Sequence, residues 1–331
     1  MMNTLLLNLN EVQSLLTIED TVEAVKAGYM AFNRGVVQMP PVVSLMAHKF
    51  NGEMDFKMGY SEQEDIIGIK MAGGYWDNPK KYNLPSGLAM ICLFDAANGV
   101  PICILDGTLI TGYRTAAAGT IGALCLARKD AENIAMIGTG MQARLQVMAL
   151  SKYFNIKNVR VYGIEGQEKY VEEMQSQHPD IHFSATSAQE AVENAEIVIT
   201  ATASHNALVY DQWVKPGTHI NAIGCDMEGK QELDPSIFMR AKIVNDSRME
   251  CKKRGDTQHP FKAGHITDDN IHAEIGEILL GQKCGRENEN EITIFDATGL
   301  SVQDINTSLF VYRKAIKNNV GKNIEVFDVN I

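Results

Sequence analysis

The small residues between positions 138 and 143 have the spacing of a turn that binds a dinucleotide. Gly138, Gly140 and Ala143 form the pattern G-x-G-x-x-A, and the apolar run Ile134–Ile137 comes directly before it. The first glycine permits the tight bend, the second lets backbone approach a pyrophosphate, and the small third residue lets the next helix pack closely. The N-terminus of that helix faces the negative charge. The pattern predicts a dinucleotide site, with a purely structural glycine turn as the alternative.

The next apolar run bears on the choice of dinucleotide. Val159–Tyr162 is the expected second strand, and Glu165 follows it closely. An acidic residue at this strand end bonds the ribose hydroxyls of NAD. No arginine follows to bind a 2′-phosphate, and Lys169 is the nearest cation. We expect NAD and leave NADP open. The alternative for Glu165 is a solvated loop position.

Alternating strands and helices surround this motif. The expected strands are 134–137, 159–162, 181–185, 197–200, 219–223, 243–244 and 292–295, and the expected helices between them are 141–151, 167–177 and 188–194. Such short apolar strands indicate a parallel sheet covered on both faces. An Ala-rich helix from about Thr115 to Ala127 precedes them, and we place Arg114 at the turn before it. This part is a Rossmann-type, doubly wound α/β domain over residues 116–300.

The chain before residue 116 has another pattern. Thr17 can cap a helix that runs to about Arg34 and ends at Gly35. Strands and turns follow from Val42 to Leu105, which favours an antiparallel sheet. We expect the last helix, about residues 302–317, to return to this module. The second domain is therefore α+β, built from residues 1–115 and completed by about 301–331.

The composition excludes several classes of function. Lys and Arg total 30 against 41 Asp and Glu, and a net charge of -11 disfavours binding to nucleic-acid phosphates. No apolar run reaches the roughly 20 residues of a membrane span, and the N-terminus does not resemble a signal peptide. The six cysteines form no C-x-x-C pair and the eight histidines have no metal spacing. We expect a cytoplasmic protein with reduced thiols and no metal.

Seven segments together resemble a known family. They are 39–41, 68–70, 111–117, 137–140, 217–226, 229–234 and 295–300. In this order they are similar to the ornithine cyclodeaminase/mu-crystallin family, over about residues 4 to 326. The resemblance implies a nicotinamide enzyme that acts at the Cα–N bond of a small amino or imino acid. It also implies a homodimer joined through the domain that is not the Rossmann domain.

The resemblance assigns roles to three charged residues. Lys70 and Arg114 match residues that bind the substrate carboxylate, for which fixed cations are suited. Asp226 matches a catalytic aspartate, which would accept the amine proton and stabilise an iminium, and we count Lys70 as catalytic with it. The alternatives are a surface lysine, an arginine that contacts only cofactor phosphates, and a turn aspartate.

Two positions depart from the family pattern. Many members have a basic residue after the Pro-Pro pair, where this chain has Val42. Its alanine dehydrogenases have an arginine where this chain has Asp55, whereas ornithine cyclodeaminases have an acidic residue near that position. Asp55 could hold the distal ammonium of a diamino acid. Lys57 lies on the same strand face and could pair with Asp55 or replace a missing cation; a surface ion pair is the alternative.

Further residues are expected to contact the cofactor. Thr200, Ala201 and Thr202 end the fourth strand and would line the nicotinamide side, as would Asp296 and Thr298 after the last strand; turn formation is the alternative. The full expected set is Arg114, Thr115, Gly138, Thr139, Gly140, Met141, Gln142, Ala143, Glu165, Thr200, Ala201, Thr202, Gly224, Asp296 and Thr298.

Three functions are compatible with these residues. The first is an NAD(P)-dependent cyclodeaminase, in which hydride leaves Cα of a diamino acid, the product cyclises with loss of ammonia, and the hydride returns. The second is a dehydrogenase or ketimine reductase with net redox chemistry. The third is a cofactor-dependent binding protein without activity, against which Lys70, Arg114 and Asp226 argue.

Overall fold

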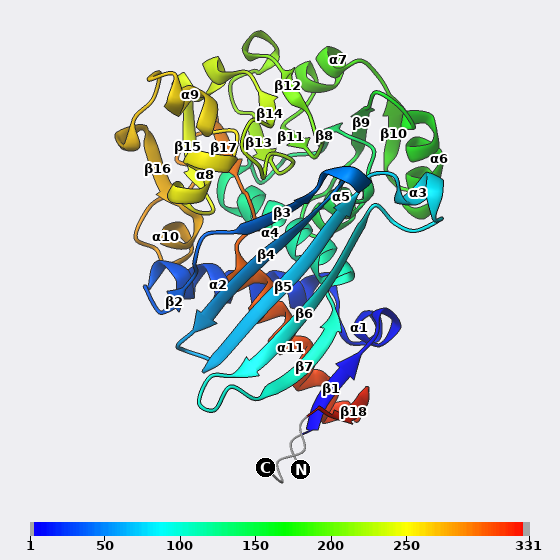
Figure 1. The fold of residues 1–331 in the computed structure, drawn as a ribbon. Coiled ribbons are helices and arrows are strands. Elements are labelled where there is room, and N and C mark those ends of the chain that lie inside the picture. The colour runs from blue at the N-terminus through cyan, green and yellow to red at the C-terminus, as the bar shows by residue number, and fades with distance from the viewer. Residues whose placement is uncertain (1–2, 327–331) are drawn as a thin grey trace. The chain divides into compact units, whose positions relative to one another are not determined.

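The computed structural model describes residues 3–326, and the chain forms two compact units. The first unit holds the chain up to Arg114 and from Leu300 onward, and the second holds Thr115–Gly299. The sequence pattern places these divisions after residues 115 and 300. The last helix does return to the first unit. Figure 1 labels the elements of both units.

A mixed sheet forms the centre of the first unit. Its strands are β1 (Asn3–Leu7), β2 (Val37–Gln38), β3 (Val43–Ala47), β4 (Gly52–Ser61), β5 (Ile66–Tyr75), β6 (Gly87–Asp95), β7 (Pro101–Asp106) and β18 (Lys322–Glu325). The order is β18-β1-β7-β6-β5-β4-β2, and β3 also pairs with β4. Neighbours from β3 to β7 are antiparallel, as expected, whereas β1 is parallel to β7.

Helices cover one face of this sheet. They are α1 (Leu9–Leu15), α2 (Ile18–Asn33) and α11 (Ser301–Asn318), while α3 (Asn78–Lys81) and the 3-10 turn η1 (His48–Phe50) lie in connections. Thr17 and Asp20 form the capping box that starts α2. Two glycines let α11 approach the sheet, because a Cβ at Gly68 would lie 2.5 Å from Cγ1 of Ile305 and one at Gly59 would lie 2.8 Å from Oγ of Ser301.

A parallel sheet forms the centre of the second unit. Its strands are β8 (Asn133–Ile137), β9 (Asn158–Tyr162), β10 (His182–Ala185), β11 (Ile197–Thr200), β13 (His219–Ala222), β15 (Ala241–Asn245), β16 (Ile271–Glu274) and β17 (Ile292–Asp296). The order is β10-β9-β8-β11-β13-β17-β15-β16, with every neighbouring pair parallel. The doubly wound fold predicted from the alternation is confirmed.

Helices and a small second sheet complete this unit. The helices are α5 (Met141–Leu150), α6 (Gln167–Gln177), α7 (Ala188–Glu193), α8 (Arg248–Arg254), α9 (Gln258–Lys262) and α10 (Ile275–Leu279), with 3-10 turns η2 (Asp211–Trp213), η3 (Pro235–Met239) and η4 (Asp268–Asn270). Strands β12 (His205–Val209) and β14 (Gln231–Leu233) pair in parallel beside them. The expected core histidine, His219, is fully buried between Thr293 and Asn221.

The helix α4 begins earlier than expected, so the expected position of Arg114 at a turn is wrong. It spans Thr108–Leu126 and so begins seven residues before Thr115. Arg114 therefore lies inside this helix and not at a turn before it. The β-branched residues Thr108, Ile110 and Thr111 disfavour a helix locally. Ile110 is completely buried, and packing of this kind overrides a weak local preference.

Three further observations concern the cysteines, metal binding and membrane spans. All six cysteines are free. Among residues 3–326, no cluster of three or more His, Cys, Asp or Glu side chains has an arrangement that could hold a metal ion. In the same part of the chain, none of the helices combines the length and the apolar character needed to cross a bilayer.

Candidate active site

The glycine turn after β8 has the geometry of a phosphate-binding loop. Gly138 has a φ of +123°, and a Cβ there would lie 2.6 Å from the carbonyl oxygen of Ala201. No atom lies within 4 Å of the Cβ position of Gly140, so its backbone borders open space. Ala143 is completely buried in the first turn of α5. Each small residue therefore satisfies the requirement from which the dinucleotide site was predicted.

A pocket of about 380 Å³ opens beside this turn. Its lining includes Thr139, Glu165 and Thr202, and the full set is Ile137, Gly138, Thr139, Gly140, Tyr162, Gly163, Ile164, Glu165, Ala201, Thr202, Ala203, Ser204 and Leu208. Glu165 is exposed, and its carbonyl oxygen accepts a hydrogen bond from Thr139 Oγ1 at 2.9 Å. Lys169, the nearest cation in the sequence, forms an ion pair with Glu173 at 3.7 Å. The residues present fit a dinucleotide.

Arg144 of α5 stabilises the same turn by hydrogen bonds. The guanidinium of Arg144 donates hydrogen bonds to the carbonyl oxygens of Thr139 and Gly140 and to the carboxylate of Glu173. Sequence reasoning missed this residue, although it comes directly after the glycine pattern. Met141 starts α5 and is exposed, and Gln142 follows it in the first turn.

Four strand ends lie level at one edge of the parallel sheet. The register aligns Ile137, Thr200, Ala222 and Asp296. Ligands bind at this carboxyl edge in open α/β sheets. The predicted residues Ala201, Thr202 and Gly224 come directly after these strands, so their place at the edge follows from the register.

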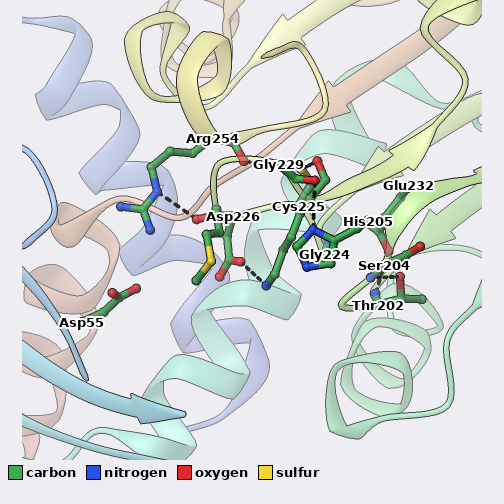
Figure 2. A network of polar contacts seen from close by, with 12 residues as sticks. Asp55, Thr202, Ser204, His205, Gly224, Cys225, Asp226, Gly229, Glu232 and Arg254 are labelled. Carbon is green, nitrogen blue, oxygen red and sulfur yellow. Dashed lines mark hydrogen bonds and ion pairs between the residues drawn. The ribbon is translucent and has the colours of Figure 1, made fainter. Parts of the chain in front are cut away.

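Asp226 lies in the loop that follows β13. Its carboxylate accepts a hydrogen bond from Lys230 Nζ at 2.8 Å, and its carbonyl oxygen accepts one from Arg254 Nε at 2.9 Å (Figure 2). The side chain is 46% exposed, so its carboxylate remains accessible. The neighbouring Cys225 is fully buried, and burial raises the pKa of its thiol, so the residue is inert.

Asp296 and Thr298 do not present their side chains as expected. Asp296 is completely buried, and its oxygens accept hydrogen bonds from the backbone of Asp256 and from the backbone and hydroxyl of Thr257. Burial raises the pKa of Asp296 to about 7. Thr298 donates a weak hydrogen bond to Asp246 at 3.4 Å. Both side chains are thus directed into the protein interior, and the carboxylate of Asp296 is committed to neighbouring residues.

A cluster of charged side chains is buried inside the first unit. Lys70 on β5 and Arg114 on α4 both contact Asp304 of α11, with nearest nitrogen–oxygen distances of 2.8 Å and 3.1 Å. These three residues are at most 6% exposed. Lys57 on β4 lies directly opposite Lys70 in the sheet register and is 8% exposed. We call Lys57, Lys70, Arg114 and Asp304 the cation cluster.

A neutral residue, Gln303, also holds the arginine of the cation cluster, and Tyr29 holds Gln303. Gln303 Oε1 accepts a hydrogen bond from Arg114 Nη1 at 3.1 Å and another from the backbone of Leu300 at 2.8 Å. Gln303 Nε2 in turn donates to the hydroxyl of Tyr29 at 2.6 Å. The guanidinium is therefore fixed from two sides, by Asp304 and by Gln303.

The cation cluster shifts the pKa values of its own members. Burial and the neighbouring Arg114 lower the pKa of Lys70 to about 7, against the opposing effect of Asp304. Burial alone would raise the pKa of Asp304, but Lys70 and Arg114 together hold it below its usual range. Lys57 acts in the same direction on both groups, which places its charge close to them. A buried amine with such a pKa is common at functional sites.

Asp55 lies on the face of β4 that also carries Lys57. Its carboxylate is half-buried and accepts a hydrogen bond from Ser44 Oγ on β3. Lys57 itself is buried, so the alternative of a surface ion pair does not describe it. This face of β4 therefore carries a cation, Lys57, inside the cation cluster and a carboxylate, Asp55, two residues earlier in the strand.

Sequence reasoning missed Asp304 and Gln303. One signal was present, because the last helix has polar residues at positions 303, 304, 307 and 308, at helical spacing within an otherwise apolar stripe. All four are at most 1% exposed. A polar stripe on a buried helix face requires partners, and a buried aspartate requires a cation. Its partner Lys70 lies 234 residues away in the chain.

Comparisons with known proteins agree with this geometry. The sequence model of the ornithine cyclodeaminase/mu-crystallin family matches residues 2–319. The alanine dehydrogenase of Archaeoglobus fulgidus is 38% identical, over 99% of this chain and 100% of its own length. An archaeal alanine dehydrogenase dimer with bound NAD is similar in structure, with a TM-score of 0.92, 38% identity, and coverage of 98% of this chain and 100% of that one. The Δ1-pyrroline-2-carboxylate reductase of Thermococcus litoralis, solved with NADH and L-proline, has a TM-score of 0.92, 35% identity, and coverage of 97% and 100%.

Proposed function

Because the chain belongs to the ornithine cyclodeaminase/mu-crystallin family and is one of its NAD(P)-dependent oxidoreductases, we propose that it interconverts a small 2-amino acid and the corresponding 2-imino acid with net redox change. The relatives above, an alanine dehydrogenase and an imino-acid reductase, support net redox chemistry. This reverses the order of the first two hypotheses from the sequence, in which a cyclodeaminase came first.

The observation that carries the proposal is the charge of the cation cluster. Lys70 and Arg114 are both buried and share the single carboxylate of Asp304. A carboxylate that binds beside them would add counter-charge to this buried pair, so the arrangement favours an anionic ligand. A planar carboxylate matches the fork of a fixed guanidinium. We therefore assign the substrate carboxylate to Lys70 and Arg114. Lys57 would supply the positive charge that many family members have at position 42, where this chain has a valine.

The pocket beside Gly138 is assigned to NAD. Its fit rests on the open backbone at Gly140 and on the exposed Glu165, which is placed to accept hydrogen bonds from ribose hydroxyls. When bound, this cofactor supplies hydride transfer to and from the substrate carbon. The protein supplies binding, orientation and proton transfer.

Asp226 is assigned the proton transfer. An amine must lose a proton before hydride can leave the adjacent carbon, and a carboxylate is a suitable acceptor. The accessible carboxylate of Asp226 meets this need, and its contact with Lys230 fixes its position. Its negative charge would also stabilise the iminium that forms.

A second candidate function is cyclodeamination of a diamino acid, and Asp55 favours it. A substrate carboxylate at the cation cluster would leave Asp55, two residues from Lys57 on the same strand face, for a distal ammonium group. The two functions differ in their net products. Only cyclodeamination releases ammonia and leaves the NADH concentration unchanged.

We also propose a homodimer. The face of the first sheet opposite α11 carries apolar side chains with large exposed fractions, including Val43 (48%), Leu45 (59%), Leu88 (45%) and Met90 (44%). Exposed apolar patches of this kind mark association sites. The archaeal alanine dehydrogenase that this chain resembles is described as a dimer.

A substrate panel tests the proposed function. Alanine, proline, ornithine and lysine are incubated with NAD⁺ or NADP⁺, and Δ1-pyrroline-2-carboxylate with NADH, while NADH and ammonia are followed. We expect NADH to form from at least one amino acid and to be consumed by the imine. Ammonia release without change in NADH would instead support cyclodeamination, and no turnover of any compound would contradict both.

The variant Asp226→Asn tests the assigned proton acceptor. Loss of a general base costs about 10² to 10⁴ in rate, so kcat should fall by at least about 100-fold. NADH binding should be retained. The matched control is Glu228→Gln in the same loop, since Glu228 forms an exposed ion pair with Lys262 at 2.8 Å. Activity of D226N equal to that of E228Q would contradict the assignment.

A further inference from the structure

Glu232 is a buried carboxylate to which the proposed reaction gives no role. It lies on β14, is completely buried, and accepts hydrogen bonds from the backbone N–H groups of Thr202 at 2.6 Å and Gly224 at 2.9 Å. These two amides follow the strands β11 and β13 (Figure 2). One side chain therefore ties together two neighbouring strand ends at the carboxyl edge of the sheet.

The two tied segments pack backbone against backbone. A Cβ at Gly224 would lie 2.4 Å from both the nitrogen and the oxygen of Thr202, and 2.6 Å from Oε1 of Glu232. Ala201, the residue before Thr202, lies against the glycine turn. A Cβ at Gly138 would lie 2.6 Å from the carbonyl oxygen of Ala201. The position of residues 201–202 therefore sets the shape of the nucleotide pocket.

Glu232 is itself held by a second carboxylate. Asp256 Oδ1 accepts hydrogen bonds from the backbone N–H groups of Glu232 at 2.8 Å and Leu233 at 3.1 Å. The backbone N–H of Asp256 donates to Asp296 at the end of β17, at 3.2 Å. Three successive carboxylates thus link the ends of β11, β13 and β17.

The acceptor role of Glu232 is specific to these two segments. Its carboxylate is buried and accepts from the backbone N–H groups of Thr202 and Gly224. An apolar side chain could fill the same space but would leave both N–H groups without an acceptor. What the carboxylate adds is a fixed geometry for two backbone amides.

We propose that Glu232 is a positioning residue for the cofactor, which holds the Thr202 segment of the pocket wall and the Gly224 segment that leads to Asp226 in the register that a bound dinucleotide requires. The cofactor part of this inference rests on the proposed function. The structural part, that Glu232 orders these two segments, does not depend on turnover or on any ligand.

The test uses Glu232→Gln, which keeps the shape of the side chain but turns an NH₂ group toward one of the two N–H donors. Hydrogen exchange, followed by mass spectrometry on peptides that cover 200–206 and 222–228, should become at least about tenfold faster at Thr202 or Gly224. The Kd of NADH, measured by nicotinamide fluorescence, should rise at least about tenfold.

The matched control is Glu196→Gln. Glu196 accepts hydrogen bonds from the backbone N–H groups of Glu132 at 2.8 Å and Asn133 at 2.9 Å, at the amino edge of the same sheet. Glu196 also forms an ion pair with Arg128 at 3.3 Å, so E196Q weakens the contacts of a carboxylate at an edge that does not line the nucleotide pocket. In E196Q, exchange should become faster at residues 132–133 while the NADH Kd stays within about twofold of the wild-type value. A purely structural role of Glu232 would leave the NADH Kd of the two variants alike.

A second variant covers the case in which E232Q does not fold. Gly224→Ala keeps Glu232 and forces apart the segments that it joins, so it should also raise the NADH Kd. Unchanged exchange at Thr202 and Gly224 in E232Q, or an NADH Kd within about twofold of wild type in either variant, would overturn the inference. Failure of the wild-type protein to bind NADH would overturn the proposed function and the cofactor part together, and the exchange data would still decide the structural part.

Discussion

At the scale of single residues, the cation cluster holds its side chains in place, but its burial also lowers the charge of Lys70. Asp304 holds both Lys70 and Arg114, which fixes their side chains before a ligand arrives. Pre-organised donors bind with a smaller entropic cost than mobile ones. The same burial lowers the pKa of Lys70 to about 7, so its charge is only partly present near neutral pH. A carboxylate that binds beside Lys70 restores the charge.

This balance predicts a pH dependence of carboxylate binding. Lys70 is cationic below its pKa of about 7 and neutral above it, so affinity for an anion should fall as the pH rises from 7 to 9. Propionate is a suitable probe, because its own charge does not change in this range. Its Kd, measured by calorimetry, should rise by up to about tenfold for each pH unit.

The control for this prediction is Lys70→Met. Its propionate Kd should be high at every pH and nearly independent of pH, because the amine that changes charge in this range is absent. A wild-type Kd that is constant from pH 6 to pH 9 would show that Lys70 keeps one protonation state and would contradict the prediction.

At the scale of elements, the sequence predicts the regular parts of the fold well and the irregular parts poorly. The run Ile134–Ile137, the glycine turn and the helix α5 were all expected, because an apolar strand before small residues has one common structural solution. The β1 strand, α1 helix and β14 strand were not expected. They are short, so few residues carry their periodicity, and they form because neighbouring elements are in place.

The candidate site follows the same division. Gly138, Gly140 and Ala143 could be found from local spacing, because each meets a local backbone requirement. Lys70, Arg114 and Asp226 were predicted only through the ordered segments of the family resemblance. Asp304 and Glu232 were missed because their partners are distant in the sequence or are backbone amides, which no spacing pattern reveals.

The glycine turn supports a prediction at this scale. In Gly138→Ala, a Cβ would have to lie 2.6 Å from the carbonyl oxygen of Ala201 while the residue keeps a φ of +123°. Both features oppose the substitution, so the free energy of unfolding should fall by at least about 1 kcal/mol. The pocket should also lose at least about tenfold in NADH affinity. Denaturant unfolding and fluorescence titration measure the two effects.

Gly264→Ala separates backbone strain from steric conflict. Gly264 also has a positive φ, +72°, but no atom lies within 4 Å of its Cβ position. This variant should lose some stability and keep its NADH affinity. Equal NADH affinity in the two variants would mean that the turn at Gly138 is not part of the cofactor site.

At the scale of the whole molecule, the exposed apolar face of the first sheet has to be explained. Cross-strand columns such as Val43–Phe56–Met71–Met90 run across β3, β4, β5 and β6 on the face opposite α11. Scattered exposed apolar residues are normal on a protein surface, but a continuous apolar sheet face is not. A second copy of the chain would bury it, since C2 dimers join the same patch on both subunits.

A twofold contact through this face predicts the effect of placing a charge on it. The wild-type protein should have twice the chain mass in light scattering after size exclusion, and Leu45→Lys should shift the equilibrium toward the single-chain mass. In a twofold interface each substitution places two unpaired charges in the contact, each costing several kcal/mol if desolvated. The control is Met239→Lys, because Met239 is 65% exposed but lies in the second unit. It should leave the mass unchanged, whereas a wild-type mass of one chain, or a dimer that persists in L45K, would exclude this face as the interface.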